Sequence, residues 1–175
     1  MPTKKKVHST SEYISINGNG ILNLLDFCVQ NDVTKFVNIS SVSVYGKSGK
    51  NGVKENVNLR PFGTYADYAI AKILAELSTE RYVIDYNINA VTLRLGYVFG
   101  DFQKGHLLFS RLLKRALDGQ EIVIEGNGEY IFDVVYINDC IDGFELALST
   151  SKTGIYNIGS EEAFSLIQMV KAIDS

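Results

Sequence analysis

The pair of side chains best suited to chemistry is Tyr68 with Lys72, in the segment YAIAK. Their four-residue spacing places both on one face of a helix, about one turn apart. An ammonium group about 4 to 6 Å away lowers the pKa of a phenol by roughly 1 to 3 units from about 10, so this tyrosine could act as a base near neutrality. In a chain with 10 tyrosines the spacing also arises by chance, and a surface helix without function is the alternative.

A second candidate is Ser41, which stands where the short apolar segment 35–40 gives way to a loop. In open α/β sheets the ligand-binding groups collect at such strand ends. The hydroxyl of Ser41 could therefore hydrogen-bond a substrate oxygen. The alternative is that Ser40, Ser41 and Ser43 only satisfy backbone groups at the end of the strand.

The elements that must position these side chains alternate along the chain. Hydrophobic periodicity predicts helices over residues 14–30, 65–86, 107–117, 139–148 and 164–173. Short β-rich segments predict strands over residues 35–40, 90–95 and 155–159. Strands that alternate with helices indicate a mostly parallel sheet covered on both faces, which is the doubly wound α/β arrangement.

The remaining segments are predicted as connections. Residues 47–60 are rich in Gly, Lys and Asn and end at Pro61, which indicates an exposed loop. Residues 96–102, GYVFGDF, are predicted as a second loop. Residues 121–137 are predicted to form two short strands around the turn at 126–128.

Composition limits the classes of function. With 175 residues, 46% of them hydrophobic, the chain is long enough for one domain or part of one. A net charge of -3 gives no general attraction to nucleic acid. Cys28 and Cys140 have no nearby partners at metal-ligand spacing, so we expect core residues in a reducing cytoplasm and no metal. No apolar run approaches the roughly 20 residues needed to cross a membrane, and we expect no membrane partner.

Five segments, taken in order, resemble the extended short-chain dehydrogenases/reductases of the NAD-dependent epimerase/dehydratase family: SSVSVYG, YAIAK, LRLGYVFG, FDVVYIND and YNIG. The segment NGNGILNLL, from Asn17, also resembles a helix of that family, and the resemblance spans nearly the whole chain. It implies that residues 1–120 form the C-terminal part of a Rossmann-like NAD(P)-binding domain with the catalytic residues. Residues 121–175 would form part of a small C-terminal substrate lobe, interleaved with the last sheet elements.

The resemblance also assigns roles to individual residues. Tyr68 matches the catalytic base or acid, and Lys72 matches the residue that lowers its pKa and holds the nicotinamide ribose. Ser41 matches the partner of the substrate oxygen, while Asn17 and Ser40 are expected beside the cofactor. The implied chemistry is removal of a hydroxyl proton by Tyr68 while a hydride passes between the substrate carbon and the nicotinamide of NAD or NADP.

The expected substrate-binding residues are Ser41, Ser43, Arg94 and Tyr97. Val42 and Ser43 stand where dehydratases of the family usually carry an acidic pair, so dehydration is disfavoured. Tyr97 stands where nucleotide-sugar enzymes often have Asn, and Phe132 where many have an Arg that binds diphosphate, which weakens the expectation of a nucleotide-sugar substrate. Arg94 matches a frequent Arg of the family, and a structural ion-pair partner is an equal alternative.

The glycine-rich loop that binds the cofactor's pyrophosphate in this family has no counterpart in the sequence. Gly46, Gly49 and Gly52 follow a strand at a similar spacing, but a polar segment ending at Pro61 comes next instead of a helix. Relative to the family the chain is expected to be cut at both ends and to expose an unpaired sheet edge. The activity of this chain alone is therefore doubtful.

Three functions stay open at this point. The first is an NAD(P)-dependent epimerase, or a related oxidoreductase, acting on a sugar or nucleotide sugar. The second is a non-catalytic remnant or interaction module that cannot bind cofactor alone, and the third is a reductase of a small carbonyl compound. The resemblance also implies a homodimer through the helices that begin near Asn17 and Tyr65.

Overall fold

The computed structural model describes residues 9–46, 52–63, 65–103, 107–124 and 126–173. The chain divides into two compact units. The first takes in the chain up to Arg94 together with Phe144–Asn157, and the second takes in Leu95–Gly143 together with the chain from Ile158. The predicted domain boundary near residue 120 stays a prediction.

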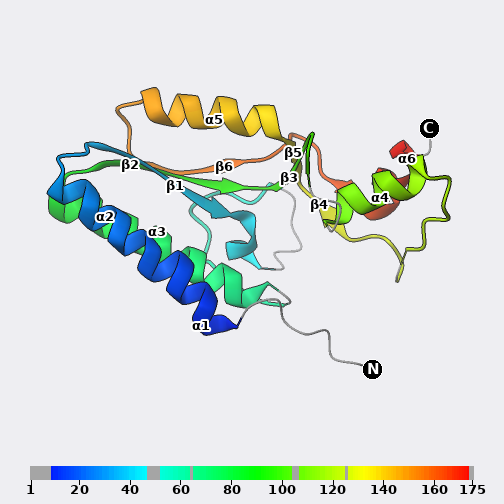
Figure 1. The fold of residues 1–175 in the computed structure, drawn as a ribbon, viewed down its shortest axis with the longest axis horizontal. Helices are drawn as coiled ribbons and strands as arrows, with labels where there is room; N and C mark the ends of the chain where they lie inside the picture. Colours follow the sequence, from blue (N-terminus) through cyan, green and yellow to red (C-terminus); the bar gives the residue numbers. More distant parts are fainter. Residues whose placement is uncertain (1–8, 47–51, 64, 104–106, 125, 174–175) are drawn as a thin grey trace. The chain divides into compact units, whose positions relative to one another are not determined.

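The first unit is built on a three-stranded sheet with the order β1 (Lys35–Ser41), β2 (Asn89–Leu95), β6 (Gly154–Ile158). The three strands run in the same direction (Figure 1). Residues 90–94 of the central strand β2 are all buried, as expected for a parallel strand covered on both faces. The strands predicted at 35–40, 90–95 and 155–159 are confirmed, and β1 is an outer strand of this sheet.

Helices cover both faces of the sheet in the first unit. α2 (Gly20–Gln30) and α3 (Ala66–Tyr86) lie side by side on one face. Residues 144–149 of α5 (Ile137–Ser149) lie on the opposite face (Figure 1). Because helices on both faces of a parallel sheet define the doubly wound α/β class, the predicted fold class is confirmed.

The N-terminal helical segment begins earlier than predicted and is not a regular α-helix throughout. Ser9 caps α1 (Thr10–Tyr13) through a reciprocal pair of hydrogen bonds with Glu12. A π-helical segment, η1 (Ile14–Asn19), separates α1 from α2. A side chain on Gly18 would put its Cβ 2.6 Å from Leu74, so glycine is what allows η1 to approach α3 this closely.

The second unit contains two pairs of short strands and two helices. β3 (Tyr97–Phe99) pairs in parallel with β5 (Val134–Tyr136), and β4 (Ile131–Phe132) pairs antiparallel with β7 (Phe164–Ser165). The helices are α4 (Leu108–Leu117) and α6 (Leu166–Ile173). The helices predicted from residues 107, 139 and 164 onward are confirmed, the last beginning at Leu166. None of the helices in the described part of the chain is both long and apolar enough to cross a membrane.

Two predictions for the second unit are wrong. Residues 121–124 form no strand, and the backbone after the turn at 126–128 bonds to a distant segment, with the Leu166 amide donating to the Tyr130 carbonyl at 3.0 Å. The predicted loop 96–102 contains β3, which is stabilised by pairing with β5. Strands of two or three residues are too short to show periodicity, and distant partners decide whether they form.

Candidate active site

Tyr68 and Lys72 lie one turn apart near the start of α3, as their spacing predicted. The Lys72 Nζ lies 5.6 Å from the centroid of the Tyr68 ring and donates a hydrogen bond to the Ile39 carbonyl at 2.7 Å. Ile39 precedes Ser41 by two residues at the carboxyl end of β1. Tyr68 and Lys72 therefore lie beside the end of the strand that carries Ser41.

Ser41 is the last residue of β1 and precedes the 3-10 turn η2 (Val42–Tyr45). Its Oγ accepts a hydrogen bond from the Ser43 amide at 3.2 Å, so the hydroxyl does satisfy a backbone group. A hydroxyl that accepts can still donate, so donation to a substrate oxygen stays possible. The Ser43 Oγ is buried and has no hydrogen-bond partner among the described residues, which suits a group that meets a ligand.

The predicted lowering of the Tyr68 pKa is wrong for the chain as it stands. Burial of the phenol, followed by the neighbouring Tyr13, raises the pKa of Tyr68 above its ordinary value. The two rings pack edge to face with centroids 5.7 Å apart. Loss of water around the phenol therefore sets the direction of the shift, and the phenol is protonated at neutral pH.

Burial also lowers the pKa of Lys72, an effect that the carboxylate of Glu76 opposes. Glu76 lies one turn after Lys72 on α3, and Arg94 lies on β2; each is 2% exposed. The Arg94 Nε and Nη2 donate to the two carboxylate oxygens of Glu76 at 3.0 and 2.6 Å, which makes a bidentate ion pair. The Ser40 hydroxyl donates to the same carboxylate. A contact of Ser40 with cofactor stays a prediction.

The remaining nitrogen of Arg94 also has partners. Its Nη1 donates to the Tyr45 Oη at 2.8 Å and to the Glu55 carbonyl at 3.0 Å. The Tyr45 hydroxyl donates in turn to the Asn157 Oδ1 at 2.6 Å on β6. This geometry supports the structural alternative for Arg94, and its contact with a substrate stays a prediction.

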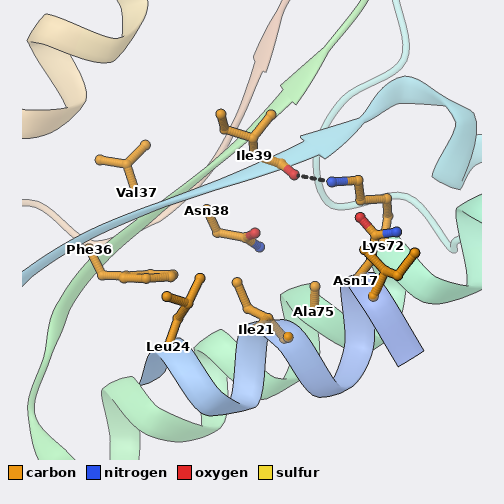
Figure 2. A pocket seen from close by; sticks show the side chains of 11 residues that line it. Asn17, Ile21, Leu24, Phe36, Val37, Asn38, Ile39, Lys72 and Ala75 are labelled. Atoms are coloured by element: carbon orange, nitrogen blue, oxygen red, sulfur yellow. Dashed lines mark hydrogen bonds between the residues drawn. The ribbon is translucent and has the colours of Figure 1, made fainter. Parts of the chain in front are cut away.

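A groove of about 310 Å³ lies between the N-terminal helical segment and β1 (Figure 2). Its walls are mostly apolar, and its polar lining consists of Asn17, Asn38 and Lys72. The Asn17 amide donates to the Tyr13 carbonyl at 3.4 Å, and Figure 2 shows the Lys72 ammonium turned toward the Ile39 carbonyl. Asn17 and Lys72, both predicted to lie beside the cofactor, therefore line the same cavity.

Tyr97 belongs to the second unit, whereas the other predicted site residues belong to the first. Its ring packs edge to face against Phe132, with centroids 5.8 Å apart. The Tyr97 hydroxyl is buried and unpaired among the described residues. An unpaired buried hydroxyl is a reasonable ligand contact, and that role stays a prediction.

The described residues contain no glycine-rich turn that leads from a strand into a helix. Gly46, with a φ of 63°, faces the Arg60 carbonyl so closely that a Cβ would lie 1.9 Å from its oxygen. No helix occurs between Gly52 and Tyr65 in the described part of that segment, which supports the interpretation of the glycine spacing as a coincidence. Gly49 lies outside the described residues. A role for Asn17, Tyr68 and Lys72 beside the nicotinamide half of a dinucleotide stays a prediction, and within the described ranges no glycine-rich turn is present that would bind its pyrophosphate.

Sequence reasoning missed Glu76, Tyr45 and Tyr13. A signal for Glu76 was available, because it lies seven residues after Ala69 and three before Thr79, both of them buried on α3. A carboxylate on that face of a helix needs a buried partner. The contacts of the two tyrosines depend on tertiary structure and left no such pattern.

A parallel sheet covered on both faces, with a Tyr-Lys pair at the end of an outer strand, defines a Rossmann-like protein of the extended short-chain dehydrogenase/reductase class. The profile of the NAD dependent epimerase/dehydratase family matches residues 3–159, and the chain belongs to that family.

Similar proteins have names that agree with this assignment. YtcB of Bacillus subtilis (strain 168), named as an uncharacterized UDP-glucose epimerase, is 32% identical over 165 residues, which cover 93% of this chain and 51% of the relative. The structure of a Bacillus cereus UDP-glucuronic acid 4-epimerase in complex with UDP-glucuronic acid and NAD is 31% identical, with a TM-score of 0.83 over 93% of this chain and 51% of that one. A UDP-N-acetylglucosamine 4-epimerase from Methanobrevibacter ruminantium M1 is 25% identical, with a TM-score of 0.86 over 91% and 52%. The chain thus spans about half the length of these relatives.

Proposed function

We propose that this chain carries the catalytic region, and part of the substrate region, of an NAD(P)-dependent epimerase or related oxidoreductase acting on a nucleotide sugar. The observation that carries the proposal is the gathering of Tyr68 and Lys72 at the end of β1 that carries Ser41. Relatives named as epimerases of UDP-sugars support the substrate class. Complexes of such relatives with NAD support the cofactor.

In this proposal each side chain has one task. Lys72 is half-buried and close to Tyr68, so it can bind a ribose hydroxyl of the cofactor and keep positive charge beside the phenol. Ser41 donates to the substrate oxygen that gains or loses a proton. NAD, when bound, supplies the acceptor and donor of the hydride.

Tyr68 moves the proton. Because its pKa is raised, the phenol is protonated at neutral pH and is ready to donate to a carbonyl oxygen of the substrate. Removal of a hydroxyl proton needs the phenolate instead. The oxidative half of the reaction is therefore expected to become faster as the pH rises toward the Tyr68 pKa.

Dehydration stays disfavoured within this proposal. Expulsion of a hydroxyl as water needs an acid near the departing oxygen. Val42 and Ser43, which open the η2 turn after Ser41, provide no carboxyl group there.

The function is tested by incubating the protein with NAD+ or NADP+ and a panel of UDP-sugars and following the products by NMR. Simple ketones with reduced cofactor serve as the comparison. Turnover of a UDP-sugar is the expected result. Turnover of ketones alone would favour the reductase of a small carbonyl compound, for which the packing of Tyr97 on Phe132 is the supporting observation.

The non-catalytic alternative rests on the missing pyrophosphate loop and on the apolar groove beside the outer strand β1. It predicts that the folded chain shows no saturable NAD binding in calorimetry at millimolar concentration and no turnover. Saturable binding of NAD+ or NADP+ would remove this alternative.

We also propose that two copies associate through the helices that begin near Asn17 and Tyr65. Ile70, Leu77 and Ile84 repeat every seven residues along α3 and are 42%, 57% and 74% exposed. Apolar residues at this spacing form one stripe, which is typical of a helix that packs against another helix. A charge in the stripe should therefore prevent association.

Sedimentation equilibrium tests this proposal with Leu77→Glu, using Leu146→Glu as the control because Leu146 is 70% exposed on α5. The unmodified protein and the control are expected to be dimers, and Leu77→Glu a monomer. A monomer in the unmodified protein would contradict the proposal.

A further inference from the structure

We propose that Glu76 and Ser40 are positioning residues, which hold the end of β1 in register with Tyr68 and Lys72 on α3. The inference deepens the proposed function and rests on it, since it concerns the same three catalytic candidates. Neither residue needs to touch substrate. Their task is to fix where Ser41 lies relative to the tyrosine and the lysine.

Two hydrogen bonds connect α3 to β1, and they involve adjacent residues of the strand and adjacent turns of the helix. Lys72 donates to the carbonyl of Ile39 at 2.7 Å, and one helical turn later Glu76 accepts from the hydroxyl of Ser40. Two successive residues of the strand are thus bound by two successive turns of the helix. A slip of one residue between the two segments would break both bonds and displace Ser41, which comes next in the chain.

The Glu76 carboxylate is itself held in place. Arg94 on β2 grips both of its oxygens, at 3.0 and 2.6 Å, and all three members of the cluster, Ser40, Glu76 and Arg94, are 2% exposed. In surroundings without water such charge-assisted bonds are strong and directional. The carboxylate can therefore act as a fixed point to which the strand end is tied.

Glu76 also acts on Lys72 through its charge. Burial disfavours the ammonium form of Lys72, and the nearby carboxylate opposes that effect. The charge of Glu76 therefore favours the protonated form of Lys72, which is the form that donates to the Ile39 carbonyl.

The state of Lys72 provides the readout. Acetic anhydride reacts with an amine only when the amine is unprotonated and accessible. The acetylation rate of Lys72, followed by peptide mass spectrometry in the 175-residue chain, therefore reports on both conditions. Ser40→Ala removes the hydroxyl that ties β1 to Glu76 and leaves the ion pair with Arg94 intact. We expect Lys72 to be acetylated several-fold faster in this variant, with an unchanged circular dichroism spectrum.

Ser78→Ala serves as the matched control, because Ser78 lies on the same helix outside the cluster. It should leave the Lys72 rate unchanged. If Ser40 and Glu76 only stabilised the fold, Ser40→Ala would lower the melting temperature and leave acetylation in the folded chain as it was, which would overturn the inference.

Glu76→Gln is the second variant, with Glu80→Gln as its control because Glu80 is exposed on the same helix. A folded Glu76→Gln protein should also show several-fold faster acetylation of Lys72, whereas Glu80→Gln should not. An unchanged rate in folded Glu76→Gln would count against the inference. If Glu76→Gln does not fold, Ser40→Ala alone decides.

The experiment needs neither cofactor nor turnover, so it separates the two proposals. Faster acetylation together with full turnover in a Tyr68→Phe protein would leave the positioning role standing and refute the proposed function. Unchanged acetylation together with loss of turnover in Tyr68→Phe would refute only the positioning role.

Discussion

Two successive turns of α3 carry charged side chains that differ in burial and in pairing. Lys72 is half-buried and donates to the Ile39 carbonyl, whereas Glu76 is 2% exposed and is bound by both Arg94 and Ser40. A buried charge is tolerated only when it is paired and hydrogen-bonded, while an ammonium that must meet a ligand has to stay accessible. The comparison shows a fully paired, buried carboxylate and a more accessible ammonium on neighbouring turns of one helix, and only the second could meet a ligand.

The largest loss of stability is expected when the buried ion pair between Glu76 and Arg94 is broken. Arg94→Met leaves the Glu76 carboxylate uncompensated in the core, so we expect the free energy of unfolding to fall by about 3 to 5 kcal/mol in urea denaturation. Lys72→Met also removes one positive charge, but at a half-buried position one helical turn before Glu76. Its effect on the free energy of unfolding should stay below about 1 kcal/mol. Equal losses in the two variants would remove the distinction between the two turns.

A smaller loss of stability is expected from a substitution at Gly46, which follows Tyr45, the hydrogen-bond partner of Arg94. Gly46 has a φ of 63° and its Cβ would meet the Arg60 carbonyl oxygen at 1.9 Å, so Gly46→Ala adds a backbone clash to a left-handed conformation. We expect a loss of about 2 kcal/mol in the free energy of unfolding.

Gly52→Ala isolates the clash, because Gly52 has a φ of 70° and open space around its Cβ position. Thermal unfolding should show a cost of about 1 kcal/mol for this control. If both substitutions cost the same, Arg60 does not constrain Gly46.

The smallest effect concerns a second tyrosine of α3. Tyr82 donates to Asp26, and this hydrogen bond raises the pKa of Tyr82 to about 12. Because the folded pKa lies above the unfolded value of about 10, the stabilising contribution is complete below pH 10 and is lost as the pH rises through about 12.

The measurement is an ultraviolet titration of tyrosinate in the unmodified chain and in Tyr82→Phe. The variant should lack one ionisation near pH 12. If the missing ionisation lies near pH 10, Asp26 does not hold the phenol. Tyr68 offers the contrast, because burial, and not a carboxylate, is the main cause of its raised pKa.

Much of the fold could be predicted from the sequence, since α3 and β2 carry their own signals. α3 has a long helical period, and β2 is a continuous buried run. The π-helical segment Ile14–Asn19 was invisible because its apolar spacing resembles that of an α-helix, and the packing of Gly18 on Leu74 became apparent only in the structure. The strands β3, β4 and β7 are shaped by distant partners.

For the site, the sequence predicted the candidate residues and their places on the elements, but not their electrostatic surroundings. The spacing of Tyr68 and Lys72 and the position of Ser41 at a strand end were correct. The direction of the Tyr68 pKa was not, because the sequence does not show how deeply the phenol is buried, nor that Tyr13 lies beside it. The helical spacing of Glu76 from Ala69 and Thr79 could have indicated a buried carboxylate, but its partner Arg94 became apparent only in the structure.

In the proposed function, Tyr68 moves the proton in a reaction on a nucleotide sugar. The most direct measurement is the turnover number of the protein with NAD+ and a UDP-sugar, before and after Tyr68→Phe, with Tyr82→Phe as the control on the same helix. We predict a loss of about 100-fold or more for Tyr68→Phe, the usual contribution of a positioned acid or base, and no change for the control. Full turnover in Tyr68→Phe would contradict the account.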